Sequence, residues 1–287
     1  MLKRIARHGL ALVATVLLGG LLSAVMVRLA PGFDVDEQQL DPRLSSESIH
    51  ALKAAREDER NVVRFYWHSL ERAAHGDLGT SISLNQPVRT LIRARAPLTL
   101  RLVGLGILLS WAVAIALALS AAWMRAATYD FVATVISGTF LCIPAAVLAL
   151  LSVLWRVPGA IAIGMIVFPR VYRYARNLLG KAYSMPHIVT ARAKGLSEWR
   201  ILFWHVVPLA APQMLAVAGV SVSIAVGAAI PVEALCGFAG VGQLAWQAAL
   251  ARDLPLLMNL TILVTLVTLM ANSGADVLGH MLRGQKA

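Results

Sequence analysis

The polar stretch at residues 178–208 lies between two strongly apolar runs, and its side chains suit a specific protein contact. Its central residues are Thr190, Ala191, Arg192, Ala193, Lys194, Gly195 and Leu196, and it ends at Pro208. Alanine and glycine allow another surface to approach closely, whereas arginine and lysine supply charge and hydrogen-bond donors. Gly195 also permits backbone angles that other residues resist. This composition predicts a short helix near residues 187–199, with a turn at Gly195, that another protein holds.

Enzyme signatures are missing from the sequence. The phosphate-binding pattern G-x-x-x-x-G-K-[ST] does not occur, so the chain has no such loop for ATP. The zinc pattern H-E-x-x-H is also missing, and the seven histidines are scattered. We therefore expect a protein that is not an enzyme and that binds no metal or cofactor itself.

Three polar residues near the ends of apolar runs are the remaining candidates for chemistry. They are Glu233, Asn272 and Asp276. Polar groups inside a membrane often mark a transport pathway. At the end of a span, however, a carboxylate can be solvated, and an asparagine can pack against another helix. Both interpretations, pathway and packing, stay open for these residues.

Six uncharged runs must position these groups, and they determine the class of protein. Hydrophobic residues make up 58% of the chain, and the mean hydropathy is +0.70. The runs are residues 9–27, 102–124, 131–155, 157–169, 206–232 and 254–275. All but the fourth have about the 20 residues that a helix needs to cross a bilayer. Because continuous apolar runs exclude the alternating pattern of a membrane β-barrel, the sequence predicts an all-α membrane protein.

The distribution of basic residues indicates that the short run at 157–169 is a sixth span. With six spans and both termini in the cytoplasm, the basic residues of the short external connections are only Arg156 and Arg252. With five spans, the basic stretch at 170–200 would lie outside, against the positive-inside rule. We therefore expect one helix that begins near Pro158, leaves the membrane near Arg170 and continues into the cytoplasm. The same rule explains the formal charge of +11, so nucleic acid is not an expected partner.

The predicted organisation has four parts. Residues 1–30 hold the first span, and residues 31–97 form an external polar segment. Residues 98–281 hold the other five spans together with the loop at 178–208, and residues 282–287 form a cytoplasmic tail. Apolar residues recur at helical spacing over residues 48–72. The external segment therefore contains a predicted helix, and it has too few apolar residues for a core of its own.

Small residues recur along the fifth apolar run. Gly219, Ser223 and Gly227 follow one another at four-residue intervals. Such a stripe lets two membrane helices approach closely. The partner helix can belong to another subunit or to the same chain.

Several motifs occur in an order that resembles a known family. Residues 190–196, with Gly195 and Pro208 at the expected interval, resemble the EAA signature of type I ABC importer permeases. The external residues Gly76, Asp77, Leu78, Gly79 and Ser81 resemble the GDLG-x-S motif of the peptide branch. The C-terminal pattern of that branch is matched by Glu233, Gly240-Val241-Gly242, Arg252-Asp253-x-Pro255, Asn272 and Asp276. From its N-terminus to about Gly279, the chain is similar to dipeptide, oligopeptide and nickel permeases. It departs from the general signature at Val189, where glutamate is usual.

This resemblance implies a fold, a location and a set of partners. The fold is that of a type I ABC importer permease in the bacterial inner membrane, with peptides as cargo. Two permease subunits, identical or related, would share one pathway. A separate ABC ATPase, which carries the ATP and Mg, would hold the loop at 178–208. A solute-binding protein would dock at the external motif. Nickel or another small solute is the alternative cargo.

Two other classes of function remain as alternatives. A secondary transporter driven by an ion gradient needs paired intramembrane carboxylates or broken inverted helices. The middles of these spans, however, are nearly free of ionisable groups. A membrane scaffold that does not transport would keep the fold and lose the cargo. An ATPase partner would distinguish the importer from both.

Overall fold

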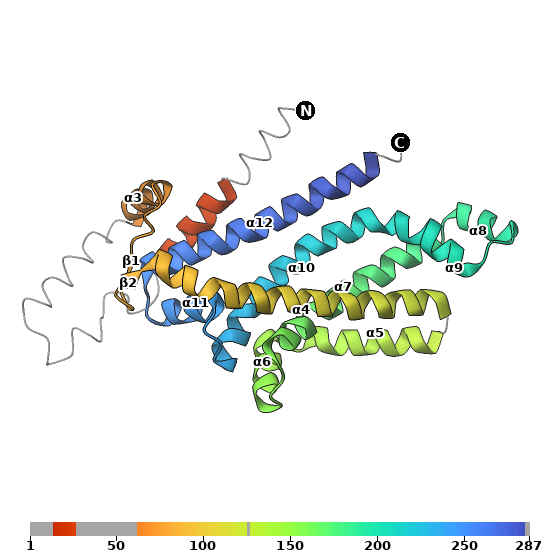
Figure 1. Cartoon of the computed structure of the whole chain (residues 1–287), viewed down its shortest axis with the longest axis horizontal. Helices are drawn as coiled ribbons and strands as arrows, with labels where there is room; N and C mark the ends of the chain where they lie inside the picture. Colours follow the sequence, from red (N-terminus) through yellow and green to blue (C-terminus); the bar gives the residue numbers. More distant parts are fainter. Residues whose placement is uncertain (1–13, 27–61, 125–126, 285–287) are drawn as a thin grey trace, which may run out of the picture. The chain divides into compact units, whose positions relative to one another are not determined.

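The computed structural model describes residues 14–26, 62–124 and 127–284, and these ranges are mostly helical, with one short hairpin (Figure 1). Contacts divide the chain into two compact units. The first unit is Met1–Ala96 with Leu244–Leu266, and the second is Pro97–Gln243 with Val267–Ala287. Helices α4 (Val88–Met124), α11 (Val241–Leu250) and α12 (Leu254–Gly284) each contribute residues to both units.

The first unit joins an N-terminal helix to the elements around the hairpin. It contains the helix Ala14–Met26, α3 (Val62–Ala74), and strand β1 (Thr80–Ser81) paired antiparallel with β2 (Gln86–Pro87). The N-terminal helix is hydrogen-bonded to α3 and to α12. The Tyr66 hydroxyl donates to the Leu17 carbonyl at 2.6 Å, and the hydroxyls of Ser23 and Thr261 are 3.0 Å apart.

Two boundaries in this region differ from the sequence prediction. The predicted external helix at 48–72 corresponds to α3, which ends at Ala74, and residues 48–61 lie outside the described residues. Helix α4 begins at Val88, inside the segment predicted to be polar and external. Its 37 residues give a length of about 55 Å, whereas the hydrocarbon layer is about 30 Å thick. Helix α4 is therefore long enough to continue beyond the membrane.

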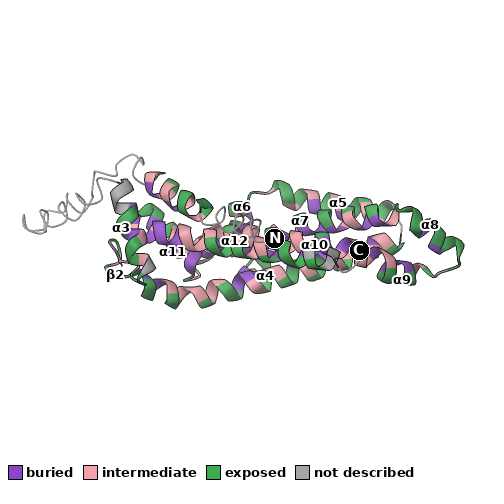
Figure 2. Ribbon diagram, turned by 90° about the horizontal axis from the view of Figure 1, so that it is seen from above, coloured by how far each residue is buried: buried purple, intermediate pink, exposed green. Residues whose placement is uncertain are grey.

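The second unit is built around helix α7 (Gly159–Tyr183), which contacts α5 (Ala127–Cys142), α6 (Ala145–Leu154) and α10 (Val207–Cys236). Figure 2 shows buried residues along α7 and α10 and exposed residues along the outer sides of α4 and α5. A Cβ atom on Gly106 would lie 2.8 Å from Ile163 and 2.9 Å from the Ala160 carbonyl oxygen. A larger residue at position 106 would collide with α7, so glycine allows the close packing of α4 and α7.

The small-residue stripe of α10 packs within the chain at two of its three positions. A Cβ atom on Gly219 would lie 2.9 Å from the Cα of Asn272. The Asn272 side-chain Nδ2 donates to the Ser223 hydroxyl at 3.1 Å. Gly227, the third member, has open space around it. Gly219 and Ser223 thus serve packing against α12 of the same chain.

The expectation of one continuous helix over residues 131–155 is wrong. Helices α5 and α6 meet at an angle of 97°, with the break at Ile143 and Pro144. Proline has no N–H to donate to the helix, and it pushes the residue before it out of the helical region. Pro144 therefore ends α5 and starts α6 within a single apolar run.

Among the described residues, three helices are long and apolar enough to cross a membrane. They are Val88–Met124, Glu198–Cys236 and Leu254–Gly279, and the bent pair Thr128–Cys142 with Ala145–Leu154 adds a fourth if it is one span. The helix Ala14–Met26 is a shorter apolar helix; the rest of the predicted first span at 9–27, like residues 285–287 of the tail, lies outside the described residues. Helix α7 runs unbroken from Gly159 to Tyr183, as predicted for the chain after Pro158.

Candidate functional site

The loop at 178–208 contains two short helices joined by a sharp turn, and we call residues 184–201 the elbow. Helix α7 ends at Tyr183, and α8 (Pro186–Ala193) follows with a proline in its first turn, where no helical N–H is needed. Helix α9 (Glu198–Ile201) comes after the turn, and the Ser197 hydroxyl accepts a hydrogen bond from the Arg200 amide at 3.4 Å. The predicted helix near 187–199 is therefore interrupted after Ala193.

Gly195 makes the turn, as its sequence predicted. Its φ is +78°, in the left-handed region that favours glycine. The Gly195 amide donates to the Arg192 carbonyl at 2.8 Å, and the Leu196 amide donates to the Ala191 carbonyl at 3.2 Å. This pair of bonds is the Schellman arrangement, which closes a helix C-terminus. No atom lies within 4 Å of a Cβ built on Gly195, so the turn faces open space.

The elbow has an inner face and an outer face. Ile188 and Ala191 are buried against the second unit's core. Thr190, Ala193 and Lys194 are exposed, as is Gly195. Ala191 therefore positions α8, while the exposed small and basic residues form the surface open to another protein.

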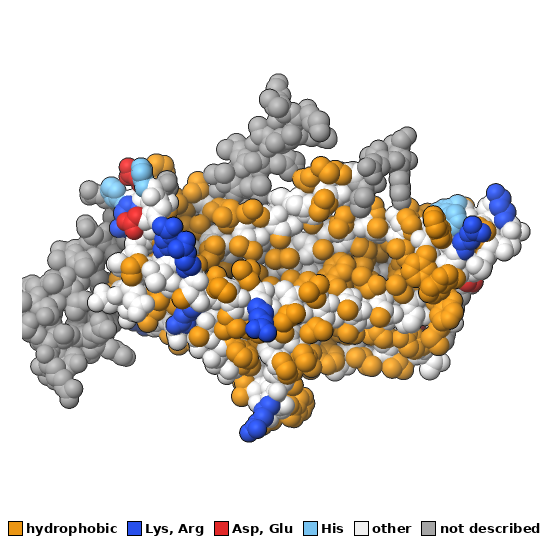
Figure 3. All heavy atoms as spheres, viewed as in Figure 1, with side chains coloured by type: hydrophobic (Ala, Val, Ile, Leu, Met, Phe, Trp, Pro, Cys, Tyr) orange, Lys and Arg blue, Asp and Glu red, His pale blue; other side chains and the backbone are white. Residues whose placement is uncertain are grey.

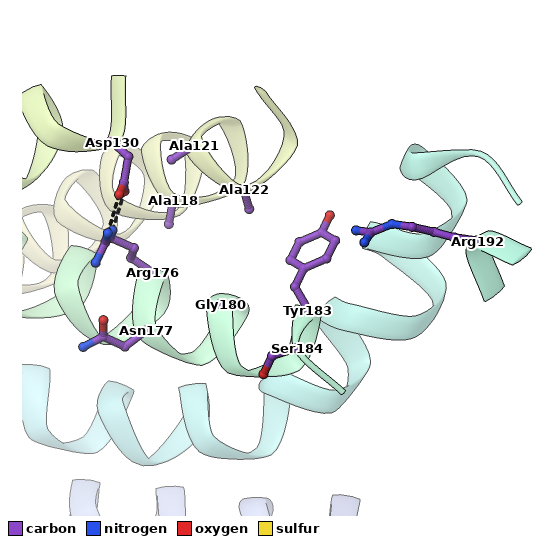
Figure 4. Close-up of a pocket in the computed structure, with 10 residues that line it drawn as sticks. All are labelled: Ala118, Ala121, Ala122, Asp130, Arg176, Asn177, Gly180, Tyr183, Ser184 and Arg192. Atoms are coloured by element: carbon purple, nitrogen blue, oxygen red, sulfur yellow. Dashed lines mark hydrogen bonds and ion pairs between the residues drawn. The ribbon is translucent and has the colours of Figure 1, made fainter. Parts of the chain in front are cut away.

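Arg192 links three parts of this region. Its Nε donates to the Glu198 Oε1 at 2.8 Å, across the turn, and its guanidinium lies 5.9 Å from the centre of the Tyr183 ring. Figure 4 shows Arg192 approaching Tyr183 from α8. The arginine thus holds α8 to α9 and to the end of α7.

A cavity of about 560 Å³ lies between the elbow and the helices beside it (Figure 4). Ala118, Ala121 and Ala122 of α4 form one wall, and Asn177, Gly180 and Ser184 belong to another. Across the cavity, the Arg176 guanidinium donates two hydrogen bonds to the Asp130 carboxylate. Sequence reasoning missed this ion pair, because 46 positions separate its members and each follows a different apolar run.

The elbow continues into the fifth apolar run without a break. Helix α9 passes through a π-helical turn, η3 (Leu202–Val206), into α10, and the whole stretch Glu198–Cys236 is one helix of 39 residues. Pro208 explains the wide turn, because it has no N–H for the Trp204 carbonyl that an α-helix would pair with it. In η3, the Val207 amide donates instead to the Leu202 carbonyl, five residues back.

Glu233 lies near the other end of α10 and is fully buried, so this carboxylate is not solvated although it stands near the end of an apolar run. Its Oε2 accepts hydrogen bonds from the amides of Gly242, at 2.6 Å, and Gln243, at 3.2 Å. These amides belong to the first turn of α11, where backbone donors lack helical partners and a negative charge is favourable. A Cβ on Gly240 would collide with the Glu233 carboxylate and with Thr99, so Glu233 and the Gly240–Gly242 motif form one structure.

The two other candidates occupy different settings on α12. Asn272 lies at the contact with α10 described above. Asp276 is exposed. Among the ranges described by the structure, no group of three or more histidine, cysteine, aspartate and glutamate side chains could hold a metal ion.

The external motif of the first unit is a chain of turns. Gly76, with φ +84°, closes the C-terminus of α3, where the Asp77 amide donates to the Arg72 carbonyl at 3.0 Å. The Asp77 carboxylate then accepts from the Gly79 amide at 2.9 Å, and Gly79 has φ +74°. The two glycines and the aspartate are thus needed for the shape of the loop itself.

The same loop is joined to the start of α12 through Asp253. The Asp253 Oδ2 accepts from the Ser81 hydroxyl at 2.5 Å and from the Ser83 amide and hydroxyl at 3.0 and 2.8 Å. Its Oδ1 accepts from the Leu256 amide at 3.1 Å, in the first turn of α12. The Asn259 side-chain Nδ2 donates to the Leu78 carbonyl at 3.0 Å. We call Leu78, Ser81, Ser83, Asp253 and Asn259 the external knot.

The chain is similar to known proteins over most of its length. A family model described as the binding-protein-dependent transport system inner membrane component matches residues 105–283. The oligopeptide transport system permease protein OppB of Salmonella typhimurium is 29% identical over 97% of both chains. The OppB protein of Escherichia coli is 27% identical over 97% of both chains, and AppB of Bacillus subtilis is 27% identical over 90% of both.

The family model covers more than half of the chain, so the chain belongs to the binding-protein-dependent transport system inner membrane component family. It is a multi-pass protein of the bacterial inner membrane and a permease subunit of an ABC importer. A permease subunit of this kind is not itself an enzyme.

Proposed function

We propose that this chain forms half of the pathway through which an ATP-driven importer carries peptides into the cell. The relatives named above are oligopeptide permeases, and this chain matches them over nearly their whole length. The residues of the external motif and of the elbow, which resemble the peptide branch, both occupy ordered turns. Peptides are therefore the first cargo to test, with nickel as the alternative.

The proposed topology has six spans and both termini in the cytoplasm. Support comes from the unbroken α7, whose apolar first half is followed by Arg170, Arg173 and Arg176 in the same helix. A helix of this kind suits a span that emerges on the side where basic residues are favoured. In this topology the elbow is cytoplasmic and the external knot faces outward.

The elbow is the proposed contact for a separate ATPase. One observation carries this proposal: α9, η3 and α10 are a single continuous helix, so a displacement of the elbow moves a membrane span. The outer face, with Thr190, Ala193, Lys194 and Gly195, offers small and basic residues to a groove. Closure of the ATPase dimer on ATP would then press the elbows of two permease subunits together and reorient their spans.

The external knot is the proposed support of the surface that a solute-binding protein meets. Three hydrogen bonds from Ser81 and Ser83 hold the loop against the buried Asp253. Asp77, Gly76 and Gly79 remain at the edge of this loop, and Asp77 is exposed. A rigid loop with an exposed edge loses little conformational freedom when it binds.

Reconstitution tests the transport proposal. The full-length chain is purified with the subunits that accompany it, and the proteins are identified by mass spectrometry. We expect an ABC ATPase and a solute-binding protein. Proteoliposomes of the complex should then take up a labelled dipeptide or oligopeptide with ATP and not with a non-hydrolysable analogue. Uptake driven by an ion gradient without ATP, or uptake of Ni²⁺ in place of peptides, would contradict the proposal.

Cysteine accessibility tests the topology. Cys142 and Cys236 are first replaced by serine, and Lys194→Cys and Asp77→Cys are introduced singly. A membrane-impermeant maleimide added to intact spheroplasts should label Asp77→Cys and leave Lys194→Cys unmodified until the membrane is opened. Labelling of Lys194→Cys from outside would place the elbow on the wrong side for an ATPase.

A further inference from the structure

Four exposed aromatic residues lie at the C-terminal end of the elbow and at the end of α4, and three of their rings are in contact. They are Trp123 in the last turn of α4, Trp199 in α9, and Phe203 and Trp204 in η3. The rings of Trp123 and Trp199 meet nearly edge to face, with centres 6.1 Å apart, and the centres of Trp199 and Phe203 are 4.4 Å apart. Trp204 is 76% exposed and Trp199 is 60% exposed. We call these four residues the aromatic patch.

The aromatic patch lies where two candidate membrane spans end. Trp123 belongs to the final turn of Val88–Met124, and the other three residues belong to the first turns of Glu198–Cys236. Tryptophan is enriched at this level of membrane proteins because its ring is apolar and its N–H is polar. On the face shown in Figure 3, hydrophobic side chains cover much of α4 and α10, and Lys, Arg and His side chains lie around α8, as others do around α3 and α6.

Exposed basic residues occur in the same part of the chain as the patch. Arg200 follows Trp199 directly, and Lys181 lies in the last turn of α7; both are exposed. Phosphate groups of the lipid surface attract such residues. Aromatic rings beside lysine and arginine therefore match the chemistry of the layer between acyl chains and headgroups.

We propose that the aromatic patch lies in the headgroup layer of the bilayer and sets the depth of the elbow. In this arrangement α9 starts at the membrane surface, while the outer face of α8 stays in water and remains free for a protein partner. The patch would hold this position whichever protein contacts α8, so the inference is independent of the proposed role of the elbow. The alternative occupant of the patch is the ATPase itself, and an experiment distinguishes the two.

The test uses tryptophan emission from the full-length chain in lipid nanodiscs. The chain has seven tryptophans. One variant keeps only Trp204, with the other six replaced by phenylalanine. Its matched control has all seven replaced and carries Val189→Trp, at a site on α8 that is 64% exposed. The nanodiscs contain phospholipids brominated either near the headgroup or deep in the acyl chain.

We expect Trp204 to be quenched several-fold more strongly by the shallow bromines than by the deep ones, with or without bound ATPase. Val189→Trp should escape both sets of bromines. Trp204 emission that no bromolipid quenches, or that loses its quenching when the ATPase binds, would overturn the proposal. If the six substitutions prevent folding, the native chain is compared with Trp204→Phe alone. The fraction of emission that shallow bromines quench should fall in this variant, and an unchanged fraction would again overturn the proposal.

Discussion

The Ser81 hydroxyl and the Asp253 carboxylate are 2.5 Å apart, although 172 positions separate the two residues in the sequence. Each belongs to a separate motif, one at the start of the hairpin and one just before α12. Their contact explains why both motifs occur together: the aspartate is the common acceptor for the loop and for the first turn of α12.

Asp253→Ala should free the loop from α12. The substitution leaves the Ser81 hydroxyl and the amides of Ser83 and Leu256 without their acceptor. We expect a loss of about 1–3 kcal/mol in the free energy of unfolding, together with faster proteolysis between Gly76 and Val88. Thermal unfolding and limited proteolysis measure the two effects. Asp276→Ala removes an exposed carboxylate from α12 and should change stability by less than about 0.5 kcal/mol. Equal behaviour of both variants would contradict the role of Asp253.

Gly240→Ala should destabilise the second unit because its methyl group would meet the Glu233 carboxylate. We expect a cost of about 1–3 kcal/mol. Glu233→Ala should also destabilise, because the amides of Gly242 and Gln243 lose a buried acceptor. The double variant removes the group that causes the collision, so its loss should be smaller than the sum of the single losses. Strict additivity in a double-mutant cycle would show that the two positions do not interact.

Two substitutions at Gly195 separate backbone strain from close approach. Alanine adds little volume but resists a positive φ, at a cost of about 1 kcal/mol. Asparagine tolerates a positive φ and adds a larger side chain that faces open space. If the turn contacts the ATPase closely, Gly195→Asn should reduce ATP-driven uptake more than Gly195→Ala does, with normal membrane insertion in both. Normal uptake by Gly195→Asn would exclude a close contact at this turn.

The ion pair between Asp130 and Arg176 should stabilise the chain only weakly. Their side chains are 32% and 39% exposed, and water screens a pair of that exposure. A double-mutant cycle with Asp130→Ala and Arg176→Ala should give a coupling of less than about 1 kcal/mol, falling as salt is added. The pair of Arg192 and Glu198 is similarly exposed and serves as the comparison. A much larger coupling for the Asp130–Arg176 pair than for the Arg192–Glu198 pair would indicate that the assembled importer buries the first pair.

The charge pattern predicted α7 better than hydropathy did. The apolar part of that helix is short, and only the basic residues after Pro169 indicated that it continues. Gly195 likewise marked its own turn, because a glycine within a polar run is a strong local signal. These features depend on neighbouring residues, so one sequence is enough to find them.

Features that depend on distant residues were not predicted. The burial of Glu233 results from α11, whose first amides need an acceptor, and nothing near position 233 shows this. Ser81 and Asp253 were both noted within motifs, but a single sequence does not reveal which residues pair. Pro144 was visible, yet the apolar residues on both sides of it hid the break between α5 and α6.

The wide turn ahead of Pro208 has a mechanical consequence. Rewinding η3 into ordinary α-helix would rotate the preceding residues by about 100° around the axis. Pro208 opposes this change, because proline has no N–H to donate to the Trp204 carbonyl in an α-helix. Glu198 and Glu233 therefore belong to one continuous helix, and a displacement of the first would also move the carboxylate that the Gly240–Gly242 motif holds.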